Sequence, residues 1–223
     1  MKMPDELRAQ VASDLRPVRP LLPAWQRALL LVPAAALAWA AAPGLFGLRP
    51  DLTAIGPALA WGGSLAQFAL AVVLIAAALR ETVPGESLST TAARLLIGGA
   101  FLVTVALAIA INAVSPEPVV RTETWFAWWY CWRGAVLSGA PLVLLLAVVL
   151  ARGLPMRPAL AGALAGLGAG AAVDGGWRLF CSYSNVTHVV GSHGGAVLAL
   201  TIAGALVAVT PRRLRQISRK EDL

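Results

Sequence analysis

The sequence is short of charge, cysteine and histidine for its 223 residues. Only 13% of the residues are charged, and there are two cysteines and two histidines. A water-soluble domain carries about a quarter charged residues, so this share excludes an ordinary soluble domain. Two cysteines exclude a disulfide-dense scaffold, and the lack of repeats and polar low-complexity tracts excludes a collagen-like or disordered chain. Apolar residues are abundant instead, at 58% of the chain with a mean hydropathy of +0.74.

The apolar residues are gathered into long stretches. A helix that crosses the hydrocarbon core of a bilayer needs about 20 of them. Six stretches reach or approach this length, at residues 28–46, 55–79, 95–114, 128–150, 159–180 and 189–209. The fifth is the least apolar, because a complete span there must include Asp174 and Arg178. We predict an all-α membrane protein, a bundle of six transmembrane helices (28–209) between an N-terminal segment (1–27) and a basic tail (210–223).

The basic residues predict how this bundle is oriented. An even number of spans puts both termini on one side, and 14 of the 18 lysines and arginines fall on that side; the exceptions are Arg49, Arg121, Arg133 and Arg178. By the positive-inside rule, both termini are cytoplasmic, and we expect a bacterial inner (cytoplasmic) membrane. The net charge of +7 then favours contact with anionic lipid, and we predict no direct binding of nucleic acid. The cytoplasmic loops at 80–94 and 151–158 are interpreted as short polar turns.

The N-terminal segment carries a helical pattern. Pro4 suits a first helical position, and Leu7, Val11 and Leu15 recur every four residues as one apolar stripe, before Pro17 ends the pattern. We predict a short amphipathic helix. Such a helix can lie on the membrane surface, stand free in solution, or dock into a groove on a soluble partner, and the pattern leaves these alternatives open.

The side chains that can bind a metal ion or undergo oxidation are predicted on the opposite, periplasmic side. Cys131 lies at the tryptophan-rich start of the fourth span, Cys181 follows the fifth, and His188 and His193 flank the start of the sixth. Two cysteines on an oxidising side can form a structural disulfide or stay a redox- or metal-responsive pair. With the histidines they form a candidate Cys2His2 set for zinc, cadmium or copper, although no Cys-x-x-Cys or His-x-x-x-His spacing is present.

Polar residues inside the spans are few, whereas small residues are abundant. Three glycines spaced four apart in the fifth span are typical of close helix packing; they are Gly162, Gly166 and Gly170. Asp174 and Arg178 are four residues apart and are expected to pair on one helix face. The remaining polar residues at membrane depth, Gln67, Thr104 and Asn112, are interpreted as scattered singly.

The chain resembles a known family. The segment 14–21 before the first span is similar to the N-terminal signature of NrsF-type proteins, the negative regulators of sigma-F. The six-span layout with Cys131 among tryptophans also resembles that family. The stretch ending at Cys181, followed by His188 and His193-Gly194-Gly195, is similar to its final hairpin. The resemblance covers essentially the whole chain.

The resemblance implies an inner-membrane anti-sigma factor, without enzymatic activity, that holds an extracytoplasmic-function sigma factor and releases it under stress. Cys131 and Cys181 would be the signal-sensing pair. The chain lacks the His-x-x-x-Cys-x-x-Cys module of soluble anti-sigma factors, so the N-terminal segment is expected to bind the sigma factor. The candidate contact residues are Leu7, Val11, Asp14, Leu15, Arg16, Val18 and Arg19.

Two other functions are alternatives to this one. A membrane thiol-disulfide oxidoreductase normally uses a closely spaced cysteine pair, whereas these two cysteines are 50 residues apart. A small transporter normally has internal repeats and polar residues at the membrane midplane, which this sequence does not display. We predict no cofactor other than an ion at the cysteine–histidine set, and the oligomeric state stays open.

Overall fold

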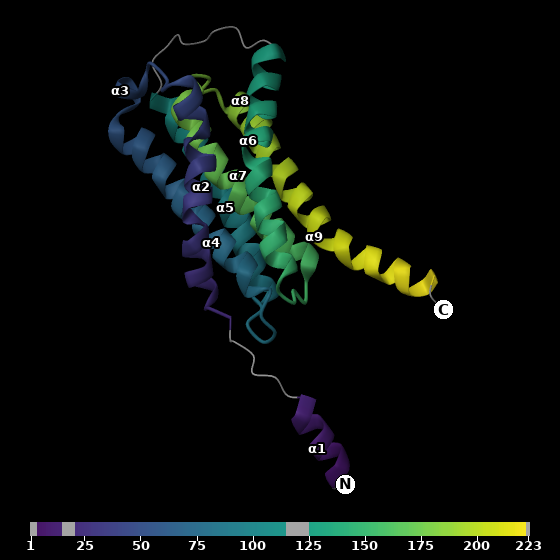
Figure 1. The fold of residues 1–223 in the computed structure, drawn as a ribbon. Helices are drawn as coiled ribbons and strands as arrows, with labels where there is room; N and C mark the ends of the chain where they lie inside the picture. The colour runs from purple at the N-terminus through teal and green to yellow at the C-terminus, as the bar shows by residue number, and fades with distance from the viewer. Residues whose placement is uncertain (1–3, 15–20, 115–124, 222–223) are drawn as a thin grey trace.

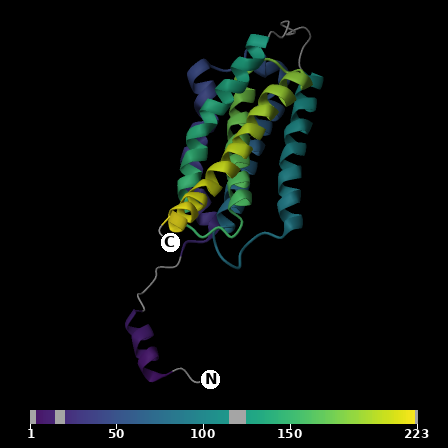
Figure 2. The same cartoon turned by 90° about the vertical axis from the view of Figure 1, so that its right-hand side faces the viewer.

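The computed structural model describes residues 4–14, 21–114 and 125–221, and every regular element in these ranges is helical. Six helices are long and apolar enough to cross a membrane, and they pack side by side (Figures 1 and 2). They are α2 (Ala24–Phe46), α4 (Gly63–Arg80) with the π-helical turn η1 (Ala58–Gly62) before it, α5 (Thr90–Val114), α6 (Trp125–Ala151), α7 (Pro158–Phe180) and α9 (Gly195–Glu221). The apolar stretch of the last one, Val186–Thr210, begins in the short elements before α9 and ends within it. The predicted all-α, six-helix class is confirmed.

The short elements show where the boundaries predicted from the sequence were wrong. The second span was expected from residue 55, but the helix α3 (Leu52–Ile55) is separate from it. Gly56 follows with a φ of +85°, a left-handed conformation that suits glycine, so the chain turns before the span begins at Ala58. The N-terminal helix α1 (Asp5–Asp14) forms as expected. Before α9 lie α8 (Val186–His188) and a second π-helical segment, η2 (Val189–Gly194).

Helix α7 is the centre of the bundle and packs against α2, α4, α6 and α9 (Figure 1). Within its most apolar window 83% of the residues are buried, against at most 50% in the other five spans. It also has the lowest hydropathy of the six, because its surroundings are protein rather than lipid. Asp174 and Arg178 therefore lie inside the bundle, at 2% and 6% exposure.

The glycines of α7 allow this close packing. A Cβ atom on Gly162 would collide with the carbonyl oxygen of Gly204 in α9, and one on Gly166 would collide with that of Leu200. On Gly170 it would lie 3.0 Å from the Cα of Val197. The glycine spacing seen in the sequence thus predicts a real contact, that between α7 and α9.

The bundle has two dissimilar ends. We call the end where α6 begins and α7 ends the cysteine end, and the other, where α2 begins, the Glu81 end. The Glu81 carboxylate is wholly buried and accepts hydrogen bonds from Arg157 at 2.8 and 3.0 Å and from the Leu88 N–H at 2.8 Å. Arg27 of α2 donates to the Thr82 hydroxyl at 3.1 Å. The two loops interpreted as plain polar turns are therefore tied together through Glu81.

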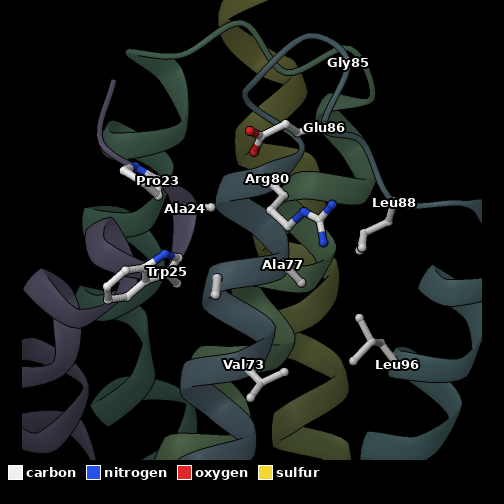
Figure 3. Close-up of a pocket in the computed structure, with 11 residues that line it drawn as sticks. Pro23, Ala24, Trp25, Val73, Ala77, Arg80, Gly85, Glu86, Leu88 and Leu96 are labelled. Carbon is white, nitrogen blue, oxygen red and sulfur yellow. The ribbon is translucent and has the colours of Figure 1, made fainter. Parts of the chain in front are cut away.

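Helix α5 stands at one side of the bundle, apart from α4 over part of its length (Figure 2). Near the Glu81 end a groove of about 600 Å³ lies between the two helices. In Figure 3, Leu96 of α5 faces Val73 and Ala77 of α4 across this groove, and Arg80 and Glu86 lie toward its rim. Leu96 and the neighbouring Ile97 and Phe101 of α5 still pack against the hydrophobic core of the bundle.

We predict that Gly166→Ala destabilises the protein, because the added methyl group meets the Leu200 carbonyl. Overpacking of this kind costs about 1–3 kcal/mol. The matched control is Gly98→Ala, since Gly98 is exposed on α5 and an added Cβ has no neighbour within 4 Å. Thermal unfolding in detergent, followed by tryptophan fluorescence, measures both. Equal stability of the two variants would contradict the α7–α9 contact.

Candidate functional site

Four residues predicted from the sequence meet at the cysteine end. Cys131, Cys181, His188 and His193 are each at least 96% buried, and one ligand atom from each lies within 4.8 Å of all the others. The two sulfurs are 3.6 Å apart and are not joined in a disulfide, and the Cys181 sulfur lies 3.5 Å from His188 Nε2. We call these four residues the Cys/His cluster.

The four residues come from different elements. Cys131 lies in the second turn of α6. Cys181 is the first residue after α7, and its N–H donates to the Trp177 carbonyl at 2.7 Å. His188 ends α8, where the Asn185 side chain accepts a hydrogen bond from its backbone N–H at 2.6 Å. The cluster thus depends on the packing of α6, α7 and the start of the last span.

A π-helical segment explains why the two histidines meet. Residues five apart in an α-helix point about 140° away from each other, because the helix has 3.6 residues per turn. A π-helix bonds residue i to i+5, which brings residues five apart to nearly the same side. His188 immediately precedes η2 and His193 lies within it, and their ring centroids are 5.4 Å apart. The spacing therefore matches no familiar ligand motif although the side chains converge.

The aromatic residues at this end have two roles. Trp125 and Phe126 are about three-quarters exposed, as expected of an interfacial belt. Trp177 is buried instead and meets the His193 ring edge-on at 6.4 Å, while Tyr183 stacks on His188 at 4.9 Å. These two rings cover the histidines and help to exclude water from the cluster.

His193 connects the cluster to a buried carboxylate. Its Nδ1 lies 2.9 Å from Asp174 Oδ1, and Arg178 Nε donates to Asp174 Oδ2 at 3.0 Å. The predicted pairing of Asp174 with Arg178 is confirmed. The Gln67 amide of α4 also donates to Asp174, and Arg178 Nη2 donates to the Thr104 carbonyl of α5 at 3.0 Å. We call these five residues the Asp174 network.

The network corrects the interpretation of Gln67 and Thr104 as scattered polar residues. Both are buried, and the Gln67 amide lies 3.5 Å from the Thr104 hydroxyl. They come from α4 and α5, so only the fold brings them to Asp174. The network thereby joins α4, α5, α7 and η2 at membrane depth.

A second buried ion pair supports the cluster from the side. Arg49, in the connection between α2 and α3, binds both oxygens of Asp51 at 2.6 and 2.7 Å. It also donates to the Ser184 hydroxyl at 2.7 Å, and its backbone N–H to the Leu179 carbonyl at 2.9 Å. These bonds fasten the segment that carries Cys181. No local pattern marks Arg49 for this role, because Leu179 and Ser184 lie more than 100 residues away in the sequence.

The predicted sigma-binding residues are placed only in part. Leu7 lies in α1 and is 48% exposed. Val11 and Asp14 belong to the same helix, but their side chains are outside the described part of the chain. Leu15, Arg16, Val18 and Arg19 lie outside the described residues altogether.

We predict strong energetic coupling between Asp174 and Arg178. Removing either partner leaves a buried, uncompensated charge, which costs about 3–5 kcal/mol. The double variant Asp174→Ala/Arg178→Ala should therefore be more stable than the sum of the single losses implies. A double-mutant cycle of unfolding in detergent measures this. The exposed pair Asp5 and Arg8, 4.0 Å apart, should show no coupling; additive losses at Asp174 and Arg178 would contradict the network.

Comparison with known proteins supports the sequence resemblance. The family model described as negative regulator of sigma F, NrsF, matches residues 11–215, which include all six spans and part of the N-terminal segment. The chain matches no curated protein and no solved structure. Because the family model covers most of its length, the chain belongs to the NrsF family, the negative regulators of sigma F.

Proposed function

We propose that this protein is an anti-sigma factor of the bacterial inner membrane. It holds an extracytoplasmic-function sigma factor on the cytoplasmic side and releases it when a periplasmic redox or metal stress reaches Cys131 and Cys181. The observation that carries the proposal is the family match combined with the gathering of four reactive side chains at one end of the bundle. Helix α2 begins, and α9 leaves the bundle, at the other end (Figure 1).

The arrangement of charge supports this orientation. At the cysteine end, Arg49 and Arg178 are neutralised by the buried carboxylates of Asp51 and Asp174, and Arg133 of α6 is exposed. The Glu81 end has the larger set of basic residues, namely Arg27, Arg80, Arg94, Arg152 and Arg157. Since lysine and arginine favour the cytoplasmic side, the Glu81 end is the cytoplasmic one.

The sigma factor is captured by the N-terminal segment and the surface next to it. An amphipathic helix binds by laying its apolar face into a groove of its partner, and Leu7, Val11 and Leu15 provide such a face. Asp14, Arg16, Val18 and Arg19 extend the contact toward the membrane. The bonds of Glu81 and Arg27 hold the neighbouring loops in place. These loops can therefore serve as a rigid second contact surface beside the N-terminal segment.

The signal passes through the Asp174 network. A change at the Cys/His cluster moves or reorients His193, whose Nδ1 contacts Asp174. Through Arg178 and Gln67 the change reaches α5 and α4. The bundle is taken to have two states, one that binds the sigma factor and one that releases it. An oxidant or metal ion shifts the equilibrium between them only as far as it interacts more favourably with one state than with the other. Release of the sigma factor follows from a weaker docking surface in the second state.

The burial of the thiols favours a sensor over an enzyme that exchanges disulfides with other proteins. Disulfide exchange requires one thiolate to approach a sulfur of the partner directly. Both cysteines are only 4% exposed, and Trp177 and Tyr183 cover the neighbouring histidines. Small oxidants and metal ions can reach such a site more readily than a protein disulfide can.

The capture of a sigma factor is tested by co-purification from detergent-solubilised membranes. The full chain should retain the sigma factor encoded beside it, and deletion of residues 1–21 should abolish retention. Leu7→Glu should weaken it, because a charge interrupts the apolar stripe. Trp125→Glu is the control, since Trp125 is also apolar and exposed but lies at the opposite end. If the full chain retains no sigma factor, the anti-sigma function is wrong.

Signal reception is tested in cells with a reporter for that sigma factor. Cys131→Ser should keep the reporter repressed both at rest and under cadmium or oxidant stress, because capture persists and release is lost. Ser138→Ala, on the same helix outside the cluster, should respond like the parent. A Cys131→Ser strain that induces normally would exclude sensing through the thiols.

A further inference from the structure

We infer that the Cys/His cluster is a four-ligand binding site for a divalent metal ion of the zinc class. Cys131 and Cys181 would bind it through sulfur, and His188 and His193 through a ring nitrogen. Zn²⁺ is the ion that this ligand set fits best, and Cd²⁺ is its natural competitor. The inference deepens the proposed function, on which it rests only for the regulatory use of the ion.

Two distances between the ligand atoms match a tetrahedral site, and all four atoms lie within 4.8 Å of one another. Zinc binds sulfur at about 2.3 Å and histidine nitrogen at about 2.0–2.1 Å, which places two sulfurs about 3.8 Å apart and a sulfur and a nitrogen about 3.5 Å apart. The two cysteine sulfurs are 3.6 Å apart, and the Cys181 sulfur is 3.5 Å from His188 Nε2. Small side-chain adjustments are sufficient to close the site around an ion.

His193 provides independent evidence that an ion belongs there. Its Nδ1 is occupied by Asp174 at 2.9 Å, while its buried Nε2 faces the cluster, and no described residue makes a hydrogen bond of normal geometry to it. A buried polar atom without a partner is unfavourable and calls for an explanation. Histidines that bind metals normally hold the ion with one ring nitrogen and a carboxylate with the other. Asp174 is therefore the positioning residue for His193.

The charges also suit a site inside the bundle. When a divalent ion enters, the two thiols each release a proton to solvent, so two thiolates balance the ion. The two neutral imidazoles add no charge, and the complete site has a net charge of zero. An uncompensated charge at this depth would be strongly unfavourable. A redox pair alone would need neither histidine.

The four ligands fill the coordination sphere, as in structural and regulatory zinc sites rather than catalytic ones. They come from α6, the end of α7, α8 and η2, so the ion joins elements that are distant in the sequence. The Asp174 contact continues this linkage to α4 and α5. Gain, loss or exchange of the ion is therefore a means of changing how the helices are held together.

The test uses the full-length protein in detergent, reduced and freed of metal with a chelator. Cobalt(II) serves as the spectroscopic probe, because its visible bands report tetrahedral geometry and its ultraviolet bands report sulfur ligands. We expect one cobalt ion per chain with both signatures, displaced by Zn²⁺ and by Cd²⁺. His193→Ala and Cys131→Ser should weaken binding by at least about tenfold. Asp174→Asn should keep the tetrahedral bands but lower the affinity about 10–100-fold.

Ser138→Ala, outside the cluster, should bind like the parent, and size-exclusion chromatography checks that each variant is folded. Cobalt spectra without sulfur bands, six-coordinate spectra, or unchanged affinity in both His188→Ala and His193→Ala would overturn the site. Metal titration needs no sigma factor, and co-purification needs no added metal, so either proposal can fail without the other. If the His193→Ala reporter responds to cadmium normally, the regulatory use of the ion is wrong.

Discussion

The structure depends on one buried carboxylate, that of Asp174 in α7. A charge inside a membrane bundle is tolerated only when it is paired and fully hydrogen-bonded. Asp174 meets this condition through Arg178 of its own helix, Gln67 of α4 and His193 of η2. Since Arg178 also binds a carbonyl of α5, three neighbouring elements are placed by the requirements of a single side chain. The orientation of His193, and with it the Cys/His cluster, follows from the same constraint.

Much of the fold could be predicted because it depends on local properties of the sequence. The length of an apolar run decides whether it can cross a membrane, so six spans were visible without any tertiary information. The spacing of Gly162, Gly166 and Gly170 places them on one helix face and predicts a close helix contact. Asp174 and Arg178, four residues apart, predict their own ion pair. Gly56 was overlooked, although glycine next to proline is a common signal for a turn.

The rest could not be predicted, because it depends on contacts between distant segments. Gln67 and Thr104 look isolated in the sequence, and only the packing of α4 and α5 against α7 brings them to Asp174. In the sequence, Glu81 looks like an ordinary residue of a polar loop. Only the fold places Arg157, from another loop, beside it and so makes it a buried ion-pair partner. The convergence of His188 and His193 requires a π-helical turn, which no spacing rule for α-helices anticipates.

Helix α5 connects the site to the rest of the molecule, and its contacts differ between the Glu81 end and the middle of the bundle. Near the Glu81 end a groove separates Leu96 of α5 from Val73 of α4 (Figure 3), although Leu96 also packs against the core. At membrane depth α5 is held by polar contacts from Arg178 and Gln67 to Thr104. Hydrogen bonds depend on direction more steeply than apolar contacts do. A small rotation of His193 that disturbs Asp174 therefore reaches α5 through the hydrogen bond from Arg178 to the Thr104 carbonyl.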